Sequence, residues 1–83
     1  MSEPTGNMQA LLEQIAKSLV DEPDQVSVSQ SDNGASSTFE LKVAPHDLGK
    51  VIGKQGRTAR AMRALISAAG VKLNKRFTLE IVE

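Results

Sequence analysis

Apolar residues follow a helical period near the start of the chain. They recur at i, i+3, i+4, i+7, i+8, i+11 and i+12, the stripe of an amphipathic helix, and its members are Met8, Leu11, Leu12, Ile15, Ala16, Leu19 and Val20. Thr5 or Asn7 is a candidate N-cap, and Pro23 is expected to stop the helix because proline disfavours helical geometry in the preceding residue. We therefore expect residues 1–7 to form a short flexible N-terminus ahead of a single domain over residues 8–83.

Two later stretches alternate between apolar and polar residues. Val26 and Val28 alternate with serines, while Phe39, Leu41 and Val43 alternate with charged residues, so both stretches are typical of half-buried strands. The segment SQSDNGASS between them has turn chemistry, including an Asn-Gly pair. Together they predict an antiparallel hairpin with a flexible tip.

A short helix and a longer one follow, separated by the sequence GKQG at residues 53–56. Pro45 suits the first position of the short helix, and Asp47 in its first turn complements the helix dipole. The longer helix is expected to begin near Arg57 and to end at Gly70. Its expected inner face consists of Ala59, Met62, Leu65, Ile66 and Ala69.

The C-terminal residues alternate again. Phe77, Leu79 and Ile81 are separated by Thr78 and Glu80, which predicts a closing strand. The order helix, strand, strand, helix, helix, strand indicates an α+β domain whose helices pack on one face of a three-stranded mixed sheet. Because a helical crossover leads into it, the last strand should lie parallel to the strand that it joins.

Length and composition argue against several classes of protein. With 83 residues, 40% of them hydrophobic, the chain suits one small globular domain better than a disordered or membrane protein. It has no cysteine, and His46 cannot build a metal centre alone, so we expect no metal and no cofactor. The sequence contains no phosphate-loop motif and no nucleophile and base pair, which argues against an enzyme or a small-molecule substrate. The start MSEPTGN lacks the features of a secretory signal, so we expect a cytoplasmic protein.

Charge is segregated along the chain although the formal net charge is zero. Residues 1–40 hold one lysine and seven acidic residues, a balance of −6, whereas residues 41–76 hold nine basic residues and one acid, a balance of +8. Two glutamates near the C-terminus bring the formal net charge of the whole chain to zero. A basic region of this kind suits an anionic partner, and the acidic region repels one.

The GKQG sequence has the composition of an anion site. Glycine lets the backbone approach a ligand closely and adopt positive φ without steric cost. The N–H groups of the bend and of the helix after it can then face an anion, with Lys54 and Arg57 adding positive charge. Two glycines at this spacing often occur by chance, so the prediction depends on the flanking helices and the surrounding basic residues.

The stretch VIGKQGRTARAMRALI resembles the signature of the KH domain, V-I-G-x-x-G followed by a helix. The order of elements resembles the prokaryotic, type II version of that fold, and the resemblance extends from Met8 to the end of the chain. The longer phrase HDLGKVIGKQGRTARAMRALISAAG is similar to the small bacterial RNA-binding KH proteins of the KhpA family, also called YlqC-like. Ala59 departs from the larger aliphatic residue of many KH domains, which implies a narrower or shallower groove wall.

The resemblance implies a clamp on about four single-stranded nucleotides, with phosphates against the G-x-x-G backbone and bases in an aliphatic groove. The residues implied at the clamp are Gly53, Lys54, Gln55, Gly56, Arg57 and Arg60. The flanking residues implied are Lys50, Ile52, Lys72, Lys75 and Arg76, the last three on the connection that borders the groove. The chain has no tyrosine or tryptophan, so base stacking on aromatic rings is not expected. Arg63 stays open between RNA contact and a solvated helix face.

The resemblance also implies partners and a cellular role. It implies pairing of the chain with itself and with a larger KH protein of the Jag or EloR type (KhpB), and a function as an RNA chaperone or post-transcriptional regulator linked to cell shape, cell wall biogenesis and envelope homeostasis. Two other classes remain open. A helix-turn-helix DNA binder also has two helices joined through a glycine turn, although the flanking strands favour the KH order. A protein-protein module could keep the KH fold without binding nucleic acid.

Overall fold

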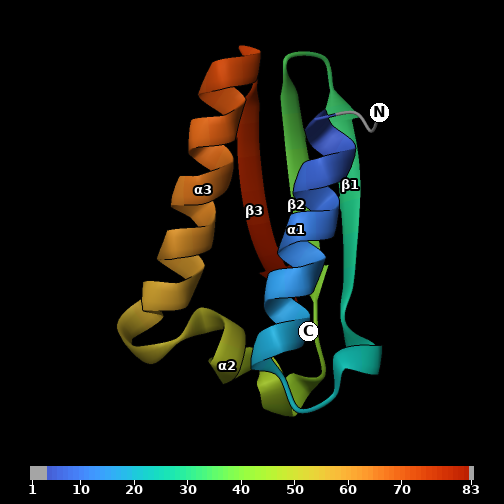
Figure 1. The fold of residues 1–83 in the computed structure, drawn as a ribbon, viewed down its shortest axis with the longest axis vertical. Helices are drawn as coiled ribbons and strands as arrows, with labels where there is room; N and C mark the ends of the chain where they lie inside the picture. Colours follow the sequence, from blue (N-terminus) through green and yellow to red (C-terminus); the bar gives the residue numbers. More distant parts are fainter. Residues whose placement is uncertain (1–3, 83) are drawn as a thin grey trace.

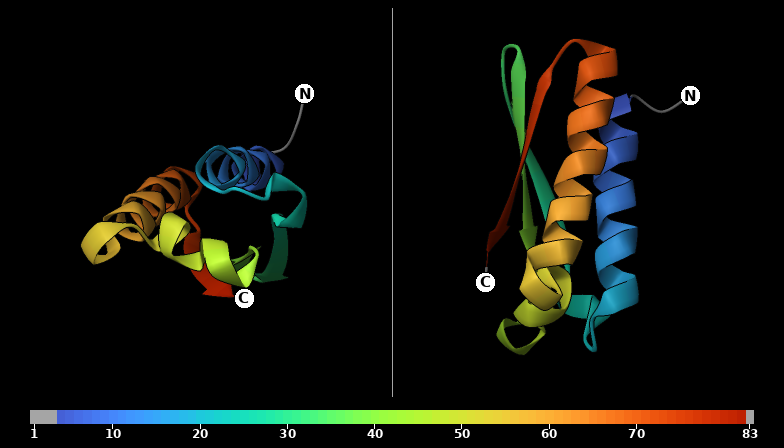
Figure 2. Two further views of the ribbon diagram at one scale, coloured as in Figure 1. Left: turned by 90° about the horizontal axis from the view of Figure 1, so that it is seen from below. Right: turned by 90° about the vertical axis from the view of Figure 1, so that its left-hand side faces the viewer.

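In the computed structural model, which describes residues 4–82 and the side chains of residues 8–82, two long helices lie on one face of a three-stranded sheet and a short third helix packs against their lower ends (Figure 1, Figure 2). The helices are α1 (Pro4–Leu19), α2 (Leu48–Ile52) and α3 (Arg57–Leu73), and the strands are β1 (Ser27–Asn33), β2 (Ser36–Lys42) and β3 (Arg76–Val82). Single 3-10 turns cover Pro23–Gln25, Pro45–Asp47 and Lys54–Gly56. The predicted α+β class and the order of helices and strands are confirmed.

The sheet has the strand order β1-β2-β3. β1 and β2 are antiparallel, with Val28 opposite Leu41. β2 and β3 are parallel, with Phe39 opposite Leu79, as the rule for helical crossovers requires. α1 packs on β1 and β2, while α3 packs along β3.

The hairpin is longer and tighter than its polar sequence predicts. Only Gly34 and Ala35 lie outside the strands at its tip, and Asn33 pairs with Ser36. Gly34 has φ of +70°, which suits the first central position of a two-residue hairpin turn. The expected flexible tip is therefore a regular turn, because the polar strand residues pair across the hairpin instead of forming a loop.

α1 begins at Pro4, ahead of the apolar stripe. Thr5 and Asn7 therefore lie inside the helix, so neither is its N-cap, and the predicted start is wrong. Residues 1–3 of the expected flexible N-terminus lie outside the described residues. Proline is tolerated in the first turn because its missing N–H would have no partner there, and this favours the early start.

α3 continues past Gly70 and ends at Leu73, so the prediction that Gly70 terminates it is wrong. Asn74 adopts the left-handed conformation, with φ of 59°, and is the residue at which the helix stops. The amide of Lys75 donates to the carbonyl of Gly70 at 2.7 Å, and the amide of Asn74 donates to that of Val71 at 3.2 Å. These two bonds form a Schellman motif, in which asparagine replaces the more usual glycine.

The core fills the space between the helices and the sheet. Its buried side chains are Leu12, Ala16, Val26, Val28, Phe39, Leu41, Val43, Val51, Met62, Ile66, Phe77 and Leu79. Phe39 and Phe77 meet edge to face, with ring centroids 5.4 Å apart. The buried face of α3 consists of Ala59, Met62, Ile66 and Gly70, and Leu65, which was expected on this face, is 50% exposed. Within the described residues, no helix has the length and apolar character needed to cross a membrane.

Candidate nucleic-acid interface

The GKQG loop is a bend between α2 and α3 at one end of the molecule (Figure 1). Gly53 has φ of 80° and ψ of 169°, and a Cβ there would lie 2.8 Å from the amide nitrogen of Thr58. Gly56 and Gln55 are both left-handed, with φ of 74° and 57°. Glycine is thus required at residue 53 by backbone angle and by close approach, and the bend has one defined shape.

Two amides of the loop have no hydrogen-bond partner among the described residues. The amide of Gly53 donates to Gly49 at 2.9 Å and that of Gly56 donates to Gly53 at 3.0 Å. The amides of Lys54 and Gln55 precede the first hydrogen bond of the 3-10 turn, and such leading N–H groups have no partner within the turn. Both residues are exposed. The bend is therefore open to solvent, with two hydrogen-bond donors available at its apex.

Positive charge surrounds this apex. Lys54, Arg57 and Arg60 are exposed, and the sequence from residue 48 to residue 79 contains no acidic residue. Arg60 donates a hydrogen bond from Nη2 to the carbonyl oxygen of Gln55 at 2.5 Å and so supports the loop. The guanidinium group has further N–H donors that this bond does not use. Arg63 is exposed farther along α3. The N-terminus of this 17-residue helix adds the positive end of its dipole.

The apolar residue next to the loop is exposed as well. Ile52 ends α2 and is 37% exposed, whereas its neighbour Val51 is fully buried in the core. Ala59, on the other side of the loop, is 3% exposed. Val51 and Ala59 therefore fix the two helices that carry the bend, and Ile52 offers an apolar surface beside it.

The remaining basic candidates lie at the opposite end of α3. Lys72 is in the last turn of α3, and Lys75 and Arg76 follow it. The end of α3 and the start of β3 lie at the top of Figure 1. Seventeen helical residues span about 25 Å at 1.5 Å per residue, so these three residues do not share a phosphate with the GKQG loop. Lys75 and Arg76 instead line a shallow depression of about 560 Å³ together with Asn33, Ala35, Ser36, Val71 and Asn74.

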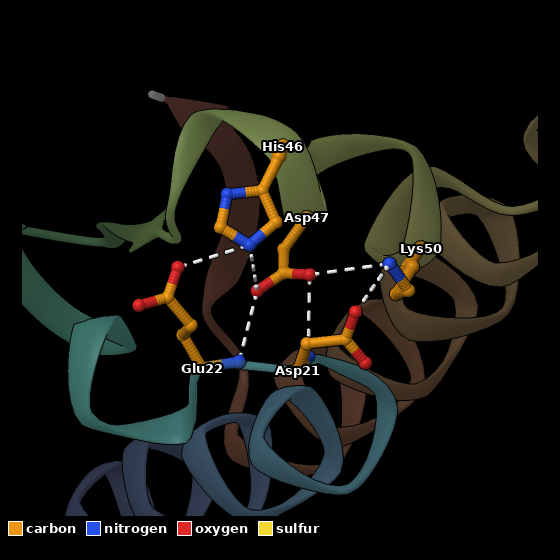
Figure 3. Close-up of polar contacts among 5 residues, drawn as sticks. All are labelled: Asp21, Glu22, His46, Asp47 and Lys50. Carbon is orange, nitrogen blue, oxygen red and sulfur yellow. Dashed lines mark hydrogen bonds and ion pairs between the residues drawn. The ribbon is translucent and has the colours of Figure 1, made fainter.

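Lys50 lies close to two carboxylates. Its Nζ is 3.2 Å from Asp21 and 3.3 Å from Asp47 (Figure 3). Hydrogen bonds to these two groups raise the pKa of Lys50. Its positive charge is therefore offset locally, unlike that of Lys54.

Sequence reasoning missed the role of Asp47. Asp47 lies in the first turn leading into α2, as expected, but its side chain is 0% exposed and caps no amide of α2. It instead accepts hydrogen bonds from the amides of Asp21 and Glu22 (Figure 3). Those partners are 26 and 25 residues away, so no local pattern could have indicated them.

The pKa of the Asp47 carboxyl reflects two opposed effects. Burial alone would raise it, but the hydrogen bonds that the carboxylate accepts outweigh burial and hold its pKa below the ordinary value. A carboxylate with a lowered pKa stabilises the fold above the ordinary aspartate pKa of about 4. That contribution is lost as the pH falls through the lowered value.

Glu22, His46 and Asp47 bring ligating atoms within 4.8 Å of one another. His46 Nε2 lies 2.9 Å from Glu22 Oε2, and both Asp47 oxygens already accept amide hydrogen bonds. The arrangement is explained as a hydrogen-bond network, and we assign no metal to it.

Comparison with known proteins supports a single family. The sequence profile described as KhpA/KhpB, KH domain matches residues 9–81. The chain is 61% identical over 75 residues to "RNA-binding protein KhpA" of Clostridium acetobutylicum, covering 90% of this chain and all of that protein. It is 53% identical over 76 residues to the protein of the same name from Halalkalibacterium halodurans, covering 92% and all of it, and 49% identical over 73 residues to that from Aquifex aeolicus, covering 88% and 92%.

Proposed function

The chain belongs to the KhpA/KhpB KH-domain family, and from this premise we propose that it binds single-stranded RNA through the GKQG loop. The observation that carries the proposal is the pair of amides without a hydrogen-bond partner at Lys54 and Gln55, on an exposed bend with no acidic residue on either flanking helix. The relatives are named as RNA-binding proteins, and our proposal assigns no catalytic step to the chain.

The loop would hold the phosphates, and the surface beside it would hold the bases. Phosphate oxygens accept from the free amides, and Lys54 and Arg57 add charge-assisted contacts at the end of the α3 dipole. Ile52, which is exposed beside the loop, would offer an unstacked base an apolar surface to pack against. Phosphate contacts carry no sequence information, so we expect binding to tolerate many sequences. Lys72, Lys75 and Arg76 would reach only a strand that continues along α3.

We expect the chain to bind an unstructured single-stranded RNA more tightly than duplex DNA of equal length at the same salt concentration. About four neutralised phosphates give a slope of about −2.8 for log K against log salt, so a fourfold rise in salt weakens binding roughly fiftyfold. Titrations by fluorescence anisotropy at several salt concentrations measure both quantities. Equal or tighter binding to the duplex would support the helix-turn-helix alternative instead.

We further propose that the chain pairs with a second copy through α3. The solvent side of this helix presents an apolar and small-residue stripe made of Ala61, Ala64, Leu65, Ala68 and Val71, of which Leu65 is 50% and Val71 is 78% exposed. A second copy offers the same stripe, and a surface on one straight helix can complement itself about a two-fold axis. A weak RNA clamp gains from such pairing because the second site acts at high effective concentration.

Pairing predicts a solution mass of about twice 8.9 kDa for the free protein, measured by light scattering without RNA. Leu65→Glu places a charge in the stripe and should reduce the mass to that of one chain. Leu11→Glu changes a residue of similar exposure, 43%, on α1 and should leave the mass unchanged. A single-chain mass for the unaltered protein would refute the pairing proposal.

The family profile covers both KhpA and KhpB domains, so a larger KhpB protein of the Jag or EloR type is the second partner that we propose for the same stripe. In the cytoplasm, such a pair would act as an RNA chaperone or post-transcriptional regulator with effects on cell shape and envelope homeostasis. Crosslinking the protein in cells and sequencing the attached nucleic acid would test this role, and recovery of no RNA above background would contradict it.

A further inference from the structure

A buried carboxylate joins the end of α1 to the start of α2 (Figure 3). Asp47 Oδ1 accepts from the amide of Asp21 at 3.2 Å, and Oδ2 accepts from the amide of Glu22 at 3.1 Å. Lys50 Nζ lies 3.3 Å from Oδ1 and supplies the counter-charge. Every polar atom of this carboxylate is thus engaged, and its contacts reach across 26 residues of sequence.

The helix that begins at this carboxylate needs external support. α2 has five residues, and isolated helices of that length are not stable in water because helix nucleation is unfavourable. Its last residue is followed directly by Gly53, so any rotation or shift of α2 moves the GKQG loop. Val51 anchors one side of α2 in the core, and the Asp47 carboxylate holds its first turn.

Lys50 belongs to the same network. It bridges Asp47 and the exposed carboxylate of Asp21, at 3.3 Å and 3.2 Å. A lysine directed at phosphate would instead be free of acidic partners, and Lys54 is exposed and forms no ion pair with the described residues. The geometry therefore separates the two lysines although they are four residues apart.

We propose that Asp47 is a positioning residue for the GKQG loop: its carboxylate fixes α2 against the end of α1, and Lys50 serves this network instead of contacting RNA. The inference rests on the proposed RNA-binding function. It adds a requirement that the loop residues themselves do not reveal, namely that the bend binds phosphate only while the start of α2 is held.

Asp47→Asn tests the positioning directly. The amide has one acceptor oxygen, so it can satisfy only one of the two backbone donors. We expect the amide resonances of Lys54 and Gln55 to shift and broaden in a nitrogen-proton correlation spectrum without RNA, while those of β2 and β3 stay in place. If the loop then keeps its binding shape about a tenth of the time, the apparent Kd for RNA rises about tenfold.

Asp24→Asn is the matched control. Asp24 is exposed in the 3-10 turn after α1, so its replacement removes the same charge near the same junction without breaking the network. We expect unchanged loop resonances and equal or slightly tighter RNA binding, because removing negative charge favours an anionic ligand. Unaltered loop resonances in Asp47→Asn would overturn the proposal.

A second pair of variants decides the role of Lys50, even if Asp47→Asn does not fold. Lys50 is at the surface, with a side chain 42% exposed, so Lys50→Gln should fold. We expect it to weaken RNA binding with an unchanged salt slope, whereas Lys54→Gln flattens the slope by about 0.7, the value for one single-strand phosphate. A slope flattened by about 0.7 in Lys50→Gln would show that Lys50 contacts the RNA and would overturn this part of the proposal.

Absence of RNA binding by the unaltered protein would refute the proposed function. The spectra recorded without RNA would still decide whether Asp47 positions the loop.

Discussion

Replacing Lys54 and Gln55 together by aspartate is expected to abolish RNA binding while leaving the fold intact. Two carboxylates at the apex would face the phosphates that the free amides bind, and like charges brought together at an interface cost several kcal/mol. A loss of that size raises the Kd at least about a hundredfold. Aspartate tolerates the left-handed conformation that Gln55 adopts, with φ of 57°, so the backbone of the bend should not change.

The control for this variant changes the net charge of the chain by the same amount, but at positions away from the GKQG loop. Lys42→Asp with Ser31→Asp changes the net charge by the same three units on exposed strand positions of the sheet face that no helix covers. We expect this control to keep most of the RNA affinity, and both double variants to keep the far-ultraviolet spectrum of the unaltered chain. RNA affinity unchanged in the loop variant would remove the GKQG bend from the binding surface.

Much of the fold follows from local periodicity. The apolar stripe of α1, the alternation in the three strands and the crossover rule together predict the element order and the mixed sheet, because each pattern reports which face of an element meets the core. The exposed loop was predictable for the same reason. Gly53 and Gly56 interrupt a helical pattern, and a bend there must leave leading amides without partners.

The features that sequence reasoning missed depend on neighbours far along the chain. Asp47 has the position of a helix-cap residue, yet its partners are the amides of Asp21 and Glu22. In the sequence, Lys50 is likewise one of several basic residues near the loop, and nothing local indicates that Asp21 lies beside it in the fold. The sequence also groups all the basic residues of its second half, whereas the length of α3 separates them into two sets about 25 Å apart.

Gly70 shows how a local rule fails when another element approaches. Glycine near the end of a helical pattern is a common terminator, but here a Cβ would lie 2.6 Å from the carbonyl oxygen of Lys75 and 3.4 Å from the ring of Phe77. Gly70 is therefore needed because the chain that enters β3 passes too close to α3 at this position to leave room for a side chain. Asn74 supplies the left-handed residue that ends the helix, and its side chain remains exposed.

Gly70→Ala is accordingly expected to destabilise the domain. Alanine gains up to about 1 kcal/mol over glycine in a helix interior. The added methyl group meets backbone that is held by the Schellman bonds, so overpacking costs about 3 kcal/mol. The net loss of about 2 kcal/mol lowers the melting temperature by about 10 °C in a domain of this size, measured by circular dichroism.

Gly49→Ala tests whether this loss comes from contact or from the substitution itself. Gly49 is also helical, but a Cβ there meets nothing within 4 Å. The same change should therefore stabilise the domain by about 0.5 to 1 kcal/mol and raise the melting temperature by about 4 °C. Opposite signs for two glycine-to-alanine changes would locate the cost of the first at the contact between α3 and β3. Stabilisation by both would show that the start of β3 can move away from α3, and that the tight turn at Asn74 does not constrain it.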